Sequence, residues 1–344
     1  MEAESLEKIG ELAPDLMGEL VKRSLVLERI AALEPIGRRA LAGRLNMPER
    51  EVRAISGALR DAGHIRLDAS GMTLTQQGQT LLHTAQRISH GVRAIAMQEA
   101  TLARLLGVAR VVIVRGDAEK EPQVLEEIGR QAAAHVRTLL RDGAVLTVTG
   151  GSTMAQVARW MPQAVPMDVL VLPARGGMGR AVEIQAGTLA ARIASALGGH
   201  HRLLHVPDQL SASAREEMLK VPDIREVVDM LAQTDVLLHG VGRADKIAMY
   251  RRMDKEAIWD MLSRGAIAEA FGYYFDIDGR IVDAAGGLGL NEETLSRVRL
   301  MAAVAAGASK AEAIIAVMHA YRHELLVTDE SAARRMIALL TGGK

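Results

Sequence analysis

From residue 111 onward, short apolar runs alternate with amphipathic helical patterns. The runs are rich in β-branched residues and nearly free of polar ones, which is typical of parallel strands covered on both faces. They occupy residues 111–114, 145–148, 169–172, 203–206, 236–239 and 325–327. This alternation predicts right-handed βαβ crossovers and an α/β fold with a doubly wound, Rossmann-like parallel sheet. Ligands of such sheets bind beyond the carboxyl ends of the strands.

The N-terminal part has a different pattern. Amphipathic helices are expected at 20–33, 36–45 and 48–62, with a turn at 46–48 that places a proline at the start of the third helix. Two short strands around a tight turn follow within residues 64–75. This order predicts a winged helix-turn-helix. We divide the chain into residues 1–90 and 91–344, with a connecting helix over 76–107.

Arginines concentrate in this N-terminal region. Eight arginines and only four acidic residues lie between residues 29 and 66. The planar guanidinium suits bidentate contact with guanine or phosphate, so the helix at 48–62 is predicted to recognise DNA. We expect Pro48, Arg50 and Arg53 nearest the base edges, with Ser56 also on the outer face. The phosphate contacts are expected from Arg38, Arg39 and Arg44. The alternative is a small helical interaction domain with solvated arginines.

One loop predicts an anion site. After the run at 145–148 come Thr149, Gly150, Gly151, Ser152 and Thr153, and a helical pattern then begins. The glycines allow a sharp turn and a close approach to a ligand, and the start of the helix offers unpaired N–H groups and a positive dipole end. A phosphate is the simplest guest. The alternative is a plain strand-to-helix turn in which Ser152 caps the helix.

Composition excludes several other classes. Lysines and arginines together number 42, as do the acidic residues, and cysteine is absent. Disulfides and thiolate metal sites are therefore excluded, and no spacing of His, Asp and Glu predicts a metal. The N terminus lacks a signal-peptide pattern, and no apolar run approaches the ~20 residues that span a bilayer. We expect a cytoplasmic protein with no membrane partner, no metal and no cofactor.

With both regions in view, the chain resembles the SorC family of sugar-responsive bacterial transcriptional regulators over essentially its whole length. The resemblance is carried by Thr-Gly-Gly-Ser-Thr-Met at 149–154, Pro-Ala-Arg-Gly-Gly at 173–177, Gln-Ala-Gly-Thr at 185–188, and the segments 265–276 and 307–310. The last two segments and Ala-Arg-Gly-Gly at 174–177 are similar to a branch that represses a central glycolytic operon until fructose 1,6-bisphosphate relieves the repression. The resemblance implies an effector domain similar to sugar-phosphate isomerases and deaminases.

The resemblance also implies an effector site. One phosphate would lie in the loop of Thr149, Gly150, Gly151, Ser152 and Thr153. Arg175, with the backbone of Gly176 and Gly177, would contact the sugar phosphate through its guanidinium fork. Gln185 and Glu269 would contact the sugar hydroxyls, and Lys310 would pair with a phosphate. Arg251 is a candidate for the second phosphate, although Arg252 serves equally well on spacing. The expected partners are operator DNA, a phosphorylated sugar and a second or further copies of the chain in a homodimer or homotetramer.

Several of these positions have structural alternatives. Glu269 lies in an apolar segment and is also explained as an ion-pair partner, and Lys310 as a solvated lysine at a helix start. A cation at that place opposes the helix dipole, however, which favours an anionic partner. His239 is expected to be a satisfied histidine at a strand end. The acidic run at 276–280 lacks the twelfth-position glutamate of a calcium loop, so a hairpin turn is predicted.

Three function classes follow from the sequence. The favoured one is a DNA-binding repressor controlled by a sugar phosphate, most specifically fructose 1,6-bisphosphate, with a regulator of another phosphorylated sugar as the nearest variant. The second is an isomerase- or deaminase-like enzyme, for which no convincing acid–base pair lies near the Thr149 loop; no catalytic residue is therefore expected. The third is an adaptor that binds protein through its helical N terminus.

Overall fold

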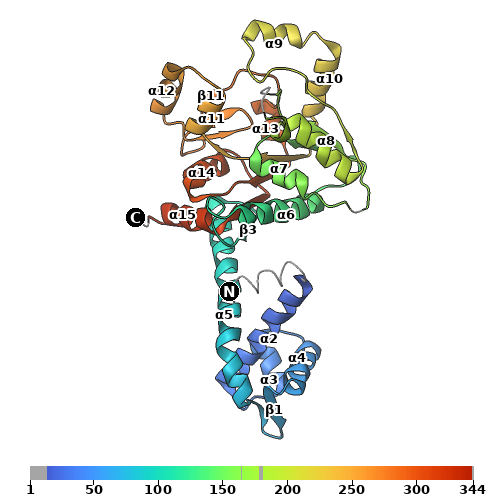
Figure 1. The fold of residues 1–344 in the computed structure, drawn as a ribbon, viewed down its shortest axis with the longest axis vertical. Helices are drawn as coiled ribbons and strands as arrows, with labels where there is room; N and C mark the ends of the chain where they lie inside the picture. Colours follow the sequence, from blue (N-terminus) through green and yellow to red (C-terminus); the bar gives the residue numbers. More distant parts are fainter. Residues whose placement is uncertain (1–13, 164, 178–180, 343–344) are drawn as a thin grey trace. The chain divides into compact units, whose positions relative to one another are not determined.

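The computed structural model of the chain describes residues 14–163, 165–177 and 181–342. These residues form two compact units, divided between Met97 and Gln98 (Figure 1). The division falls inside the long helix α5 (Gln76–Leu106), which was predicted as a connecting helix over 76–107.

The first unit is a winged helix-turn-helix. Its elements are α2 (Pro14–Leu33), α3 (Arg38–Leu45), α4 (Glu49–Asp61), β1 (Ile65–Asp68), β2 (Gly71–Leu74) and the start of α5. One apolar core joins the helices to the wing; its fully buried members include Val26, Ile30 and Val52. The antiparallel pair β1–β2 gains a third partner because Ile36 exchanges two backbone hydrogen bonds with Met72. The predicted fold of this region is confirmed.

The turn between α3 and α4 has the residues that its geometry requires. Asn46 ends α3 in the left-handed conformation, with φ of 51°, which asparagine tolerates better than most residues. Pro48 precedes α4, and its carbonyl accepts hydrogen bonds from Glu51 and Val52. The prediction that Ser56 faces outward was wrong. Ser56 is 1% exposed, and its hydroxyl donates to the carbonyl of Arg53 at 3.2 Å, which lets a small polar side chain join the apolar face.

The second unit contains a seven-stranded, fully parallel sheet with the order β3-β13-β12-β7-β4-β5-β6. Its strands are β3 (Arg110–Val114), β4 (Val145–Val148), β5 (Leu170–Pro173), β6 (His200–His201), β7 (Val236–Gly240), β12 (Leu300–Val304) and β13 (Leu325–Asp329). The chain runs outward from β4 to β6 in one direction and from β7 to β13 in the other. The order therefore reverses between the neighbours β4 and β7, as in a doubly wound fold.

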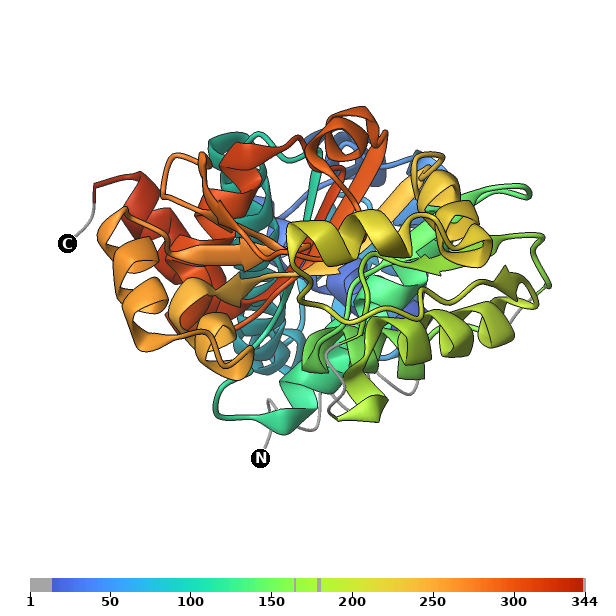
Figure 2. The same cartoon turned by 90° about the horizontal axis from the view of Figure 1, so that it is seen from above.

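Helices cover both faces of this sheet. The helices α6 (Pro122–Leu139), α7 (Ser152–Arg159) and α8 (Ala186–Leu197) share one apolar core with the strands. Because crossovers are right-handed and the strand order reverses, α14 (Ala311–Ala320) belongs to the opposite face. Figure 2 shows the layers along the sheet. This unit also contains α13 (Glu292–Arg297) and α15 (Glu330–Leu340), with short 3₁₀ turns at Val182–Ile184 and Ala308–Lys310.

Two strand predictions differ from the structure. The run at 203–206 is not a strand: β6 is only His200–His201, and the chain continues irregularly with Leu204 and Val206 buried. The apolar residues of this run predicted a strand, but they lie in an irregular segment. Conversely, β12 was missed because Met-Ala-Ala-Val at 301–304 has only one β-branched residue, Val304, whereas strands such as β3 and β4 are rich in them.

A smaller antiparallel sheet lies beside the main one, with the order β11-β10-β9-β8. Its strands are β8 (Gly242–Arg243), β9 (Ala268–Ala270), β10 (Tyr273–Phe275) and β11 (Ile281–Ala284), and it packs with α11 (Ala244–Tyr250) and α12 (Lys255–Ser263). The predicted hairpin at 276–280 is confirmed: Asp276 and Arg280 pair through their backbones between β10 and β11. Two further helices, α9 (Ala212–Met218) and α10 (Pro222–Leu231), lie between β6 and β7 in the chain.

In the part of the chain that the structure describes, no helix is both long and apolar enough to cross a membrane.

Candidate functional site

A cavity of about 280 Å³ opens where the strand order reverses, at the carboxyl ends of β4 and β7. Its volume is near the lower end for small-molecule sites, roughly 300 Å³. The ends of the two strands are tied together because the Gly240 N–H donates to Thr149 Oγ1 at 3.1 Å. Of the effector residues predicted from the sequence, all but Gly177 line this cavity. They are Thr149, Gly150, Gly151, Ser152, Thr153, Arg175, Gly176, Gln185, Arg251, Glu269 and Lys310.

The loop after β4 offers backbone donors to the cavity. Gly151 has φ of 124°, a conformation that side chains rarely adopt, and a Cβ on Gly150 would lie 2.7 Å from the Ile184 carbonyl oxygen. The first backbone bond of α7 runs from Ala155 to Gly151. Among the described residues, no acceptor therefore pairs with the N–H groups of the three residues 152–154. Such a helix start favours an anion.

The alternative in which Ser152 caps this helix does not hold. The N-cap position belongs to Gly151, which has no side chain, and Ser152 is the first residue of α7 itself. The hydroxyl of Ser152 takes no part in capping, and Thr153 is buried beside it. The turn therefore leaves its donors open to the cavity, as the phosphate interpretation requires.

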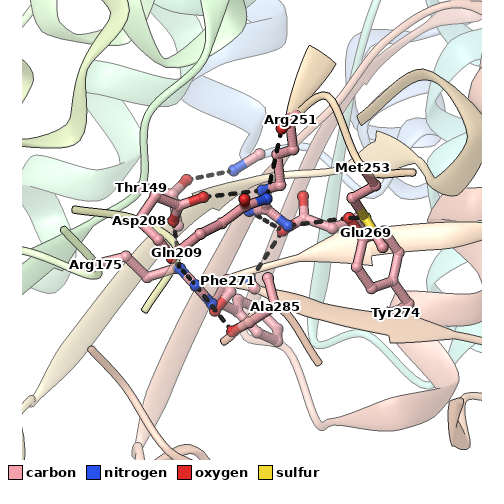
Figure 3. Close-up of polar contacts among 12 residues, drawn as sticks. Thr149, Arg175, Asp208, Gln209, Arg251, Met253, Glu269, Phe271, Tyr274 and Ala285 are labelled. Carbon is pink, nitrogen blue, oxygen red and sulfur yellow. Dashed lines mark hydrogen bonds and ion pairs between the residues drawn. The ribbon is translucent and has the colours of Figure 1, made fainter. Parts of the chain in front are cut away.

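The guanidinium of Arg175 holds three loops together. Its Nε donates to Asp208 Oδ1 at 3.0 Å, and its Nη2 donates to the carbonyls of Asp208 and Ala285 at 3.2 and 3.1 Å (Figure 3). A longer contact of 3.4 Å reaches the carbonyl of Phe271. The space exists because residue 272 is glycine: a Cβ there would lie 1.3 Å from Nη1. Most donors of Arg175 are thus used inside the protein, which differs from the fork on a sugar phosphate that the resemblance implied.

Arg251 lies between two carboxylates. Its Nη2 donates to Glu269 Oε1 at 2.9 Å, its Nη1 donates to the hydroxyl of Tyr274 at 3.2 Å, and its Nε lies 3.1 Å from Asp208 Oδ2 (Figure 3). The side chain is 5% exposed. Burial acts to lower the pKa of Arg251, but the carboxylates of Glu269 and Asp208 outweigh it and raise the pKa. Arg252, which served equally well on spacing, is exposed and does not line the cavity.

Glu269 therefore fits its structural alternative. It lies in the middle of β9, and Oε1 also accepts the Gly272 N–H at 2.9 Å. With Arg251 paired to the same oxygen, this carboxylate is an ion-pair partner before any sugar hydroxyl approaches.

Lys310 is the cation of the cavity without a close carboxylate. Within the described ranges, no Asp or Glu oxygen lies within ion-pair distance of its amine. Burial lowers the pKa of Lys310, and the more distant charges of Glu119 and Asp329 only partly oppose this. A half-buried cation that lines a cavity and lacks a counter-ion favours an anionic ligand.

Gly176 and Gly177 follow Arg175 in the loop after β5, and only Gly176 lines the cavity. A Cβ on Gly176 would lie 2.3 Å from the Val206 carbonyl oxygen, so only glycine fits there. Gly177 lies outside the lining because its backbone is paired: its N–H donates to Val206 and its carbonyl accepts from Asp208. Gln185 precedes α8 and reaches the cavity from the loop after the 3₁₀ turn.

In the first unit, the six predicted DNA-contacting residues are all exposed. They are Arg38, Arg39, Arg44, Pro48, Arg50 and Arg53. Arg53 approaches only Glu49 of its own helix, at 3.5 Å with both side chains largely exposed, which is a weak pair. Pro48 precedes α4 at its N-cap position, and Arg50 and Arg53 follow on the first turns of the helix. This face can meet a polyanion at little cost in broken contacts.

Comparison with known proteins finds two family models on the chain. A family model described as "CggR N-terminal DNA binding domain" matches residues 20–88, and one described as "Putative sugar-binding domain" matches residues 92–338. The chain is 36% identical over 328 residues to the Central glycolytic genes regulator of Bacillus subtilis, which covers 95% of this chain and 96% of the relative. A protein from Enterococcus faecalis described as a SorC family transcriptional regulator is 34% identical, with a TM-score of 0.65 over 70% of this chain and 99% of that chain.

The chain belongs to the SorC family of sugar-responsive transcriptional regulators. The crystal structure of the full-length sorbitol operon regulator SorC from Klebsiella pneumoniae is 18% identical, with a TM-score of 0.67 over 88% of this chain and 94% of that chain, and shares the fold. As a SorC family regulator, the chain combines a DNA-binding domain with a sugar-binding domain.

A buried histidine pair lies next to the cavity residue Phe271. His239 Nε2 and His323 Nε2 are 2.9 Å apart, and the ring of His239 meets the ring of Phe271 edge-on at 4.9 Å. Burial lowers the pKa of His239 to about 3, helped by the neighbouring His323, and lowers that of His323 to about 4. His239 is thus a satisfied strand-end histidine, as predicted. In the described ranges, no cluster of three or more His, Asp and Glu is arranged to hold a metal.

The sequence analysis missed several lining residues, of which Asp208 and Phe271 bear most on the chemistry of the cavity. Asp208 and Phe271 both contact the cavity, and Asp208 pairs with both buried arginines. Asp208 follows the apolar run at 203–206, so the rule that ligands bind beyond strand ends could have marked it. Phe271 has φ of 41° at the β9–β10 turn, and nothing in the sequence indicates this conformation.

Proposed function

We propose that this SorC family regulator is a repressor of a central glycolytic operon whose DNA binding is controlled by fructose 1,6-bisphosphate. The observation that carries the proposal is the cavity at the β4–β7 switch point. It joins the open N–H groups at the start of α7 to the uncompensated amine of Lys310. The 36% identity to a protein named Central glycolytic genes regulator supports the choice of operon.

Phosphate is favoured over a neutral sugar by the charge of the lining. Arg175, Arg251 and Lys310 are opposed by only two carboxylates, Asp208 and Glu269, which leaves one positive charge. The α7 start adds a positive dipole end to this excess. A neutral sugar would leave Lys310 half-buried without a counter-ion, whereas a phosphate group compensates it.

The same lining argues against an enzyme. Both carboxylates of the cavity are ion-paired to arginines, so neither is a free base of the kind that a sugar-phosphate isomerase needs. We propose that the ligand acts as a signal without turnover, that no cofactor takes part, and that the regulator acts in the cytoplasm on operator DNA as a homodimer or homotetramer.

Control of DNA binding then follows from a population shift. The phosphorylated sugar binds one arrangement of the regulator more tightly, and that arrangement binds the operator less tightly. The factor by which the sugar weakens operator binding equals the factor by which the operator weakens sugar binding, and it cannot exceed the ratio of the sugar affinities of the two arrangements.

A thermal-shift panel of sugar phosphates tests the proposal, because a ligand of the folded state raises the melting temperature by mass action. Fructose 1,6-bisphosphate is expected to give a large shift, and monophosphates a small one. In Lys310→Met the shift is expected to be lost while operator binding in anisotropy titrations is kept. Lys246→Met, on the outer part of α11, is the matched control and should keep both.

A large shift with another phosphorylated sugar, and none with fructose 1,6-bisphosphate, would reassign the effector. Operator fragments from glycolytic promoters that fail to bind even at low salt would contradict the repressor function, since arginine–phosphate contacts are strongest there.

A further inference from the structure

The cavity carries its own counter-ion for the two buried arginines. Asp208 is 6% exposed; its Oδ1 accepts from Arg175 Nε at 3.0 Å, and its Oδ2 lies 3.1 Å from Arg251 Nε (Figure 3). One carboxylate thus contacts both guanidiniums, and all three residues line the cavity.

The contact of Asp208 with Arg251 is an ion pair without a hydrogen bond. The two atoms are close enough to bond, but the N–H of Arg251 is not aimed at the oxygen, and both Nε and Oδ2 are buried without a hydrogen-bond partner. A buried donor left unpaired costs free energy. A phosphate oxygen placed in the cavity could satisfy Arg251 Nε, because phosphate accepts hydrogen bonds from many directions.

A phosphate cannot simply be added to the existing charges. A phosphate monoester carries about two negative charges, whereas the lining has an excess of only one positive charge. A bisphosphate adds still more negative charge. A buried site that gains this charge is relieved if one of its two carboxylates leaves.

Of the two carboxylates, only Asp208 is placed to leave. Glu269 is in the central part of the small sheet, in β9 between β8 and β10, and its oxygen is also bound by the Gly272 N–H. Asp208 lies in the irregular segment 202–211, outside any helix or strand. That segment is attached by a few backbone bonds, from the Asp208 N–H to Gly177 and from the Leu210 N–H to Gly286.

We propose that Asp208 is an internal counter-ion that the phosphorylated ligand displaces from Arg175 and Arg251, and that its displacement frees the segment 206–211. This segment leads directly into α9 and α10, at the end of the sugar-binding unit opposite α6 (Figure 1). Ligand binding is thereby converted into movement of these two helices. The inference rests on the proposed function, since it requires a phosphate-bearing ligand in this cavity.

Hydrogen exchange of the unaltered protein gives the first test. With saturating fructose 1,6-bisphosphate, the peptide that covers residues 206–211 should exchange faster, while the peptide that covers residues 149–154 should exchange more slowly because its N–H groups gain acceptors. Ligands usually slow exchange around a site, so an increase at 206–211 is specific to displacement. Unchanged or slower exchange at 206–211, together with protection at 149–154, would overturn the inference.

The second test is the affinity of Asp208→Asn, measured by calorimetry with fructose 1,6-bisphosphate. Removal of the competing charge should tighten binding about tenfold, a change of roughly 1.4 kcal/mol. The matched control is Asp235→Asn. Asp235 also pairs with an arginine, Arg141, and accepts a backbone N–H, but it lies at the opposite, amino end of β7; its affinity should be unchanged. Weaker binding by Asp208→Asn would mean that Asp208 positions the arginines for the ligand and is not displaced.

The two proposals fail in different ways. If neither fructose 1,6-bisphosphate nor inorganic phosphate binds the unaltered protein, both are wrong. If fructose 1,6-bisphosphate binds and protects 149–154 but Asp208→Asn gains no affinity and 206–211 stays protected, only the counter-ion inference is wrong. Should Asp208→Asn not fold, the exchange experiment on the unaltered protein decides alone.

Discussion

The two units use arginine in opposite ways. In the winged helix-turn-helix, the arginines at the turn and on α4 are exposed, and Arg53 has only a weak pair with Glu49. In the sugar-binding unit, Arg175 and Arg251 are 12% and 5% exposed and are held by carboxylates and carbonyls of the chain itself. An exposed arginine is available to a polyanion and contributes little to stability. Loss of a buried one is costly because its carboxylate partners stay buried without a counter-ion, and most of its donors are already used inside the protein.

The largest effect that tests this difference is on stability. Arg251→Ala leaves Asp208 and Glu269 buried with fewer partners and should destabilise the sugar-binding unit by about 3–5 kcal/mol. Urea unfolding followed by tryptophan fluorescence measures this unit alone, because both tryptophans, Trp160 and Trp259, lie in it.

The control for this prediction is Arg243→Ala. Arg243 also pairs with an aspartate, Asp245, at 2.9 Å, but both side chains are partly exposed, so a loss below about 1 kcal/mol is expected. Equal losses in the two variants would show that burial does not distinguish the two ion pairs.

The second effect is on the pH dependence of the sugar-binding unit. The folded-state pKa values of His239 and His323 are about 3 and about 4, below the ordinary value of 6.5. Between pH 6.5 and 4 these two histidines bind protons in the unfolded chain but stay neutral in the folded chain. The free energy of unfolding therefore falls as the pH falls. From pH 6.5 to 5 the loss should be about 2 kcal/mol for each histidine.

The same urea titrations at pH 7, 6 and 5 check this loss. The double variant His239→Leu/His323→Leu serves as the control, and the comparison concerns its slope against pH rather than its absolute stability. A slope as steep as that of the unaltered protein would assign the pH dependence to other groups.

The third effect concerns the exposed arginines. Arg53→Ala should cost about 1–3 kcal/mol at its preferred operator and narrow the difference between operator and scrambled DNA. Fluorescence anisotropy at several salt concentrations measures both. Arg44→Ala, expected on a phosphate, should weaken both DNAs equally and lower the salt slope by about 1. An unchanged operator preference in Arg53→Ala would remove this residue from base recognition, and neither variant should alter the unfolding of the sugar-binding unit.

Much of the fold could be read from local pattern. The helices and wing of the first unit follow the helical spacing and the turn at 46–48, and five strands of the parallel sheet follow from continuous apolar runs. The strand predictions failed where the type of the side chains does not match the pairing of the backbone. The run at 203–206 contains buried Leu204 and Val206 but is not a strand, whereas β12 is paired but built largely from alanine and methionine.

Part of the candidate site could also be predicted from local sequence. The anion-binding character predicted for the loop at 149–153 depends on consecutive residues, because glycines followed by a helix start favour an anion locally. The partners of Arg175 and Arg251 were not readable, since Asp208 and Glu269 are brought to them from other segments. Gly272 is an example: its need to be glycine comes from an arginine 97 positions earlier in the chain, whose guanidinium occupies the space of a Cβ.

The sequence by itself determined the two folds, the exposed basic face and the phosphate-type loop, because each depends on spacing along a few tens of residues. Only the tertiary structure decided which charged side chains pair with one another inside the protein. The energy of a buried ion depends on its distance to other ions and on the water that burial removes, and neither quantity is fixed until distant segments meet. The sequence therefore marked Arg175, Arg251 and Glu269 as residues of one site. In the folded chain, Asp208 pairs with both arginines and Glu269 pairs with Arg251.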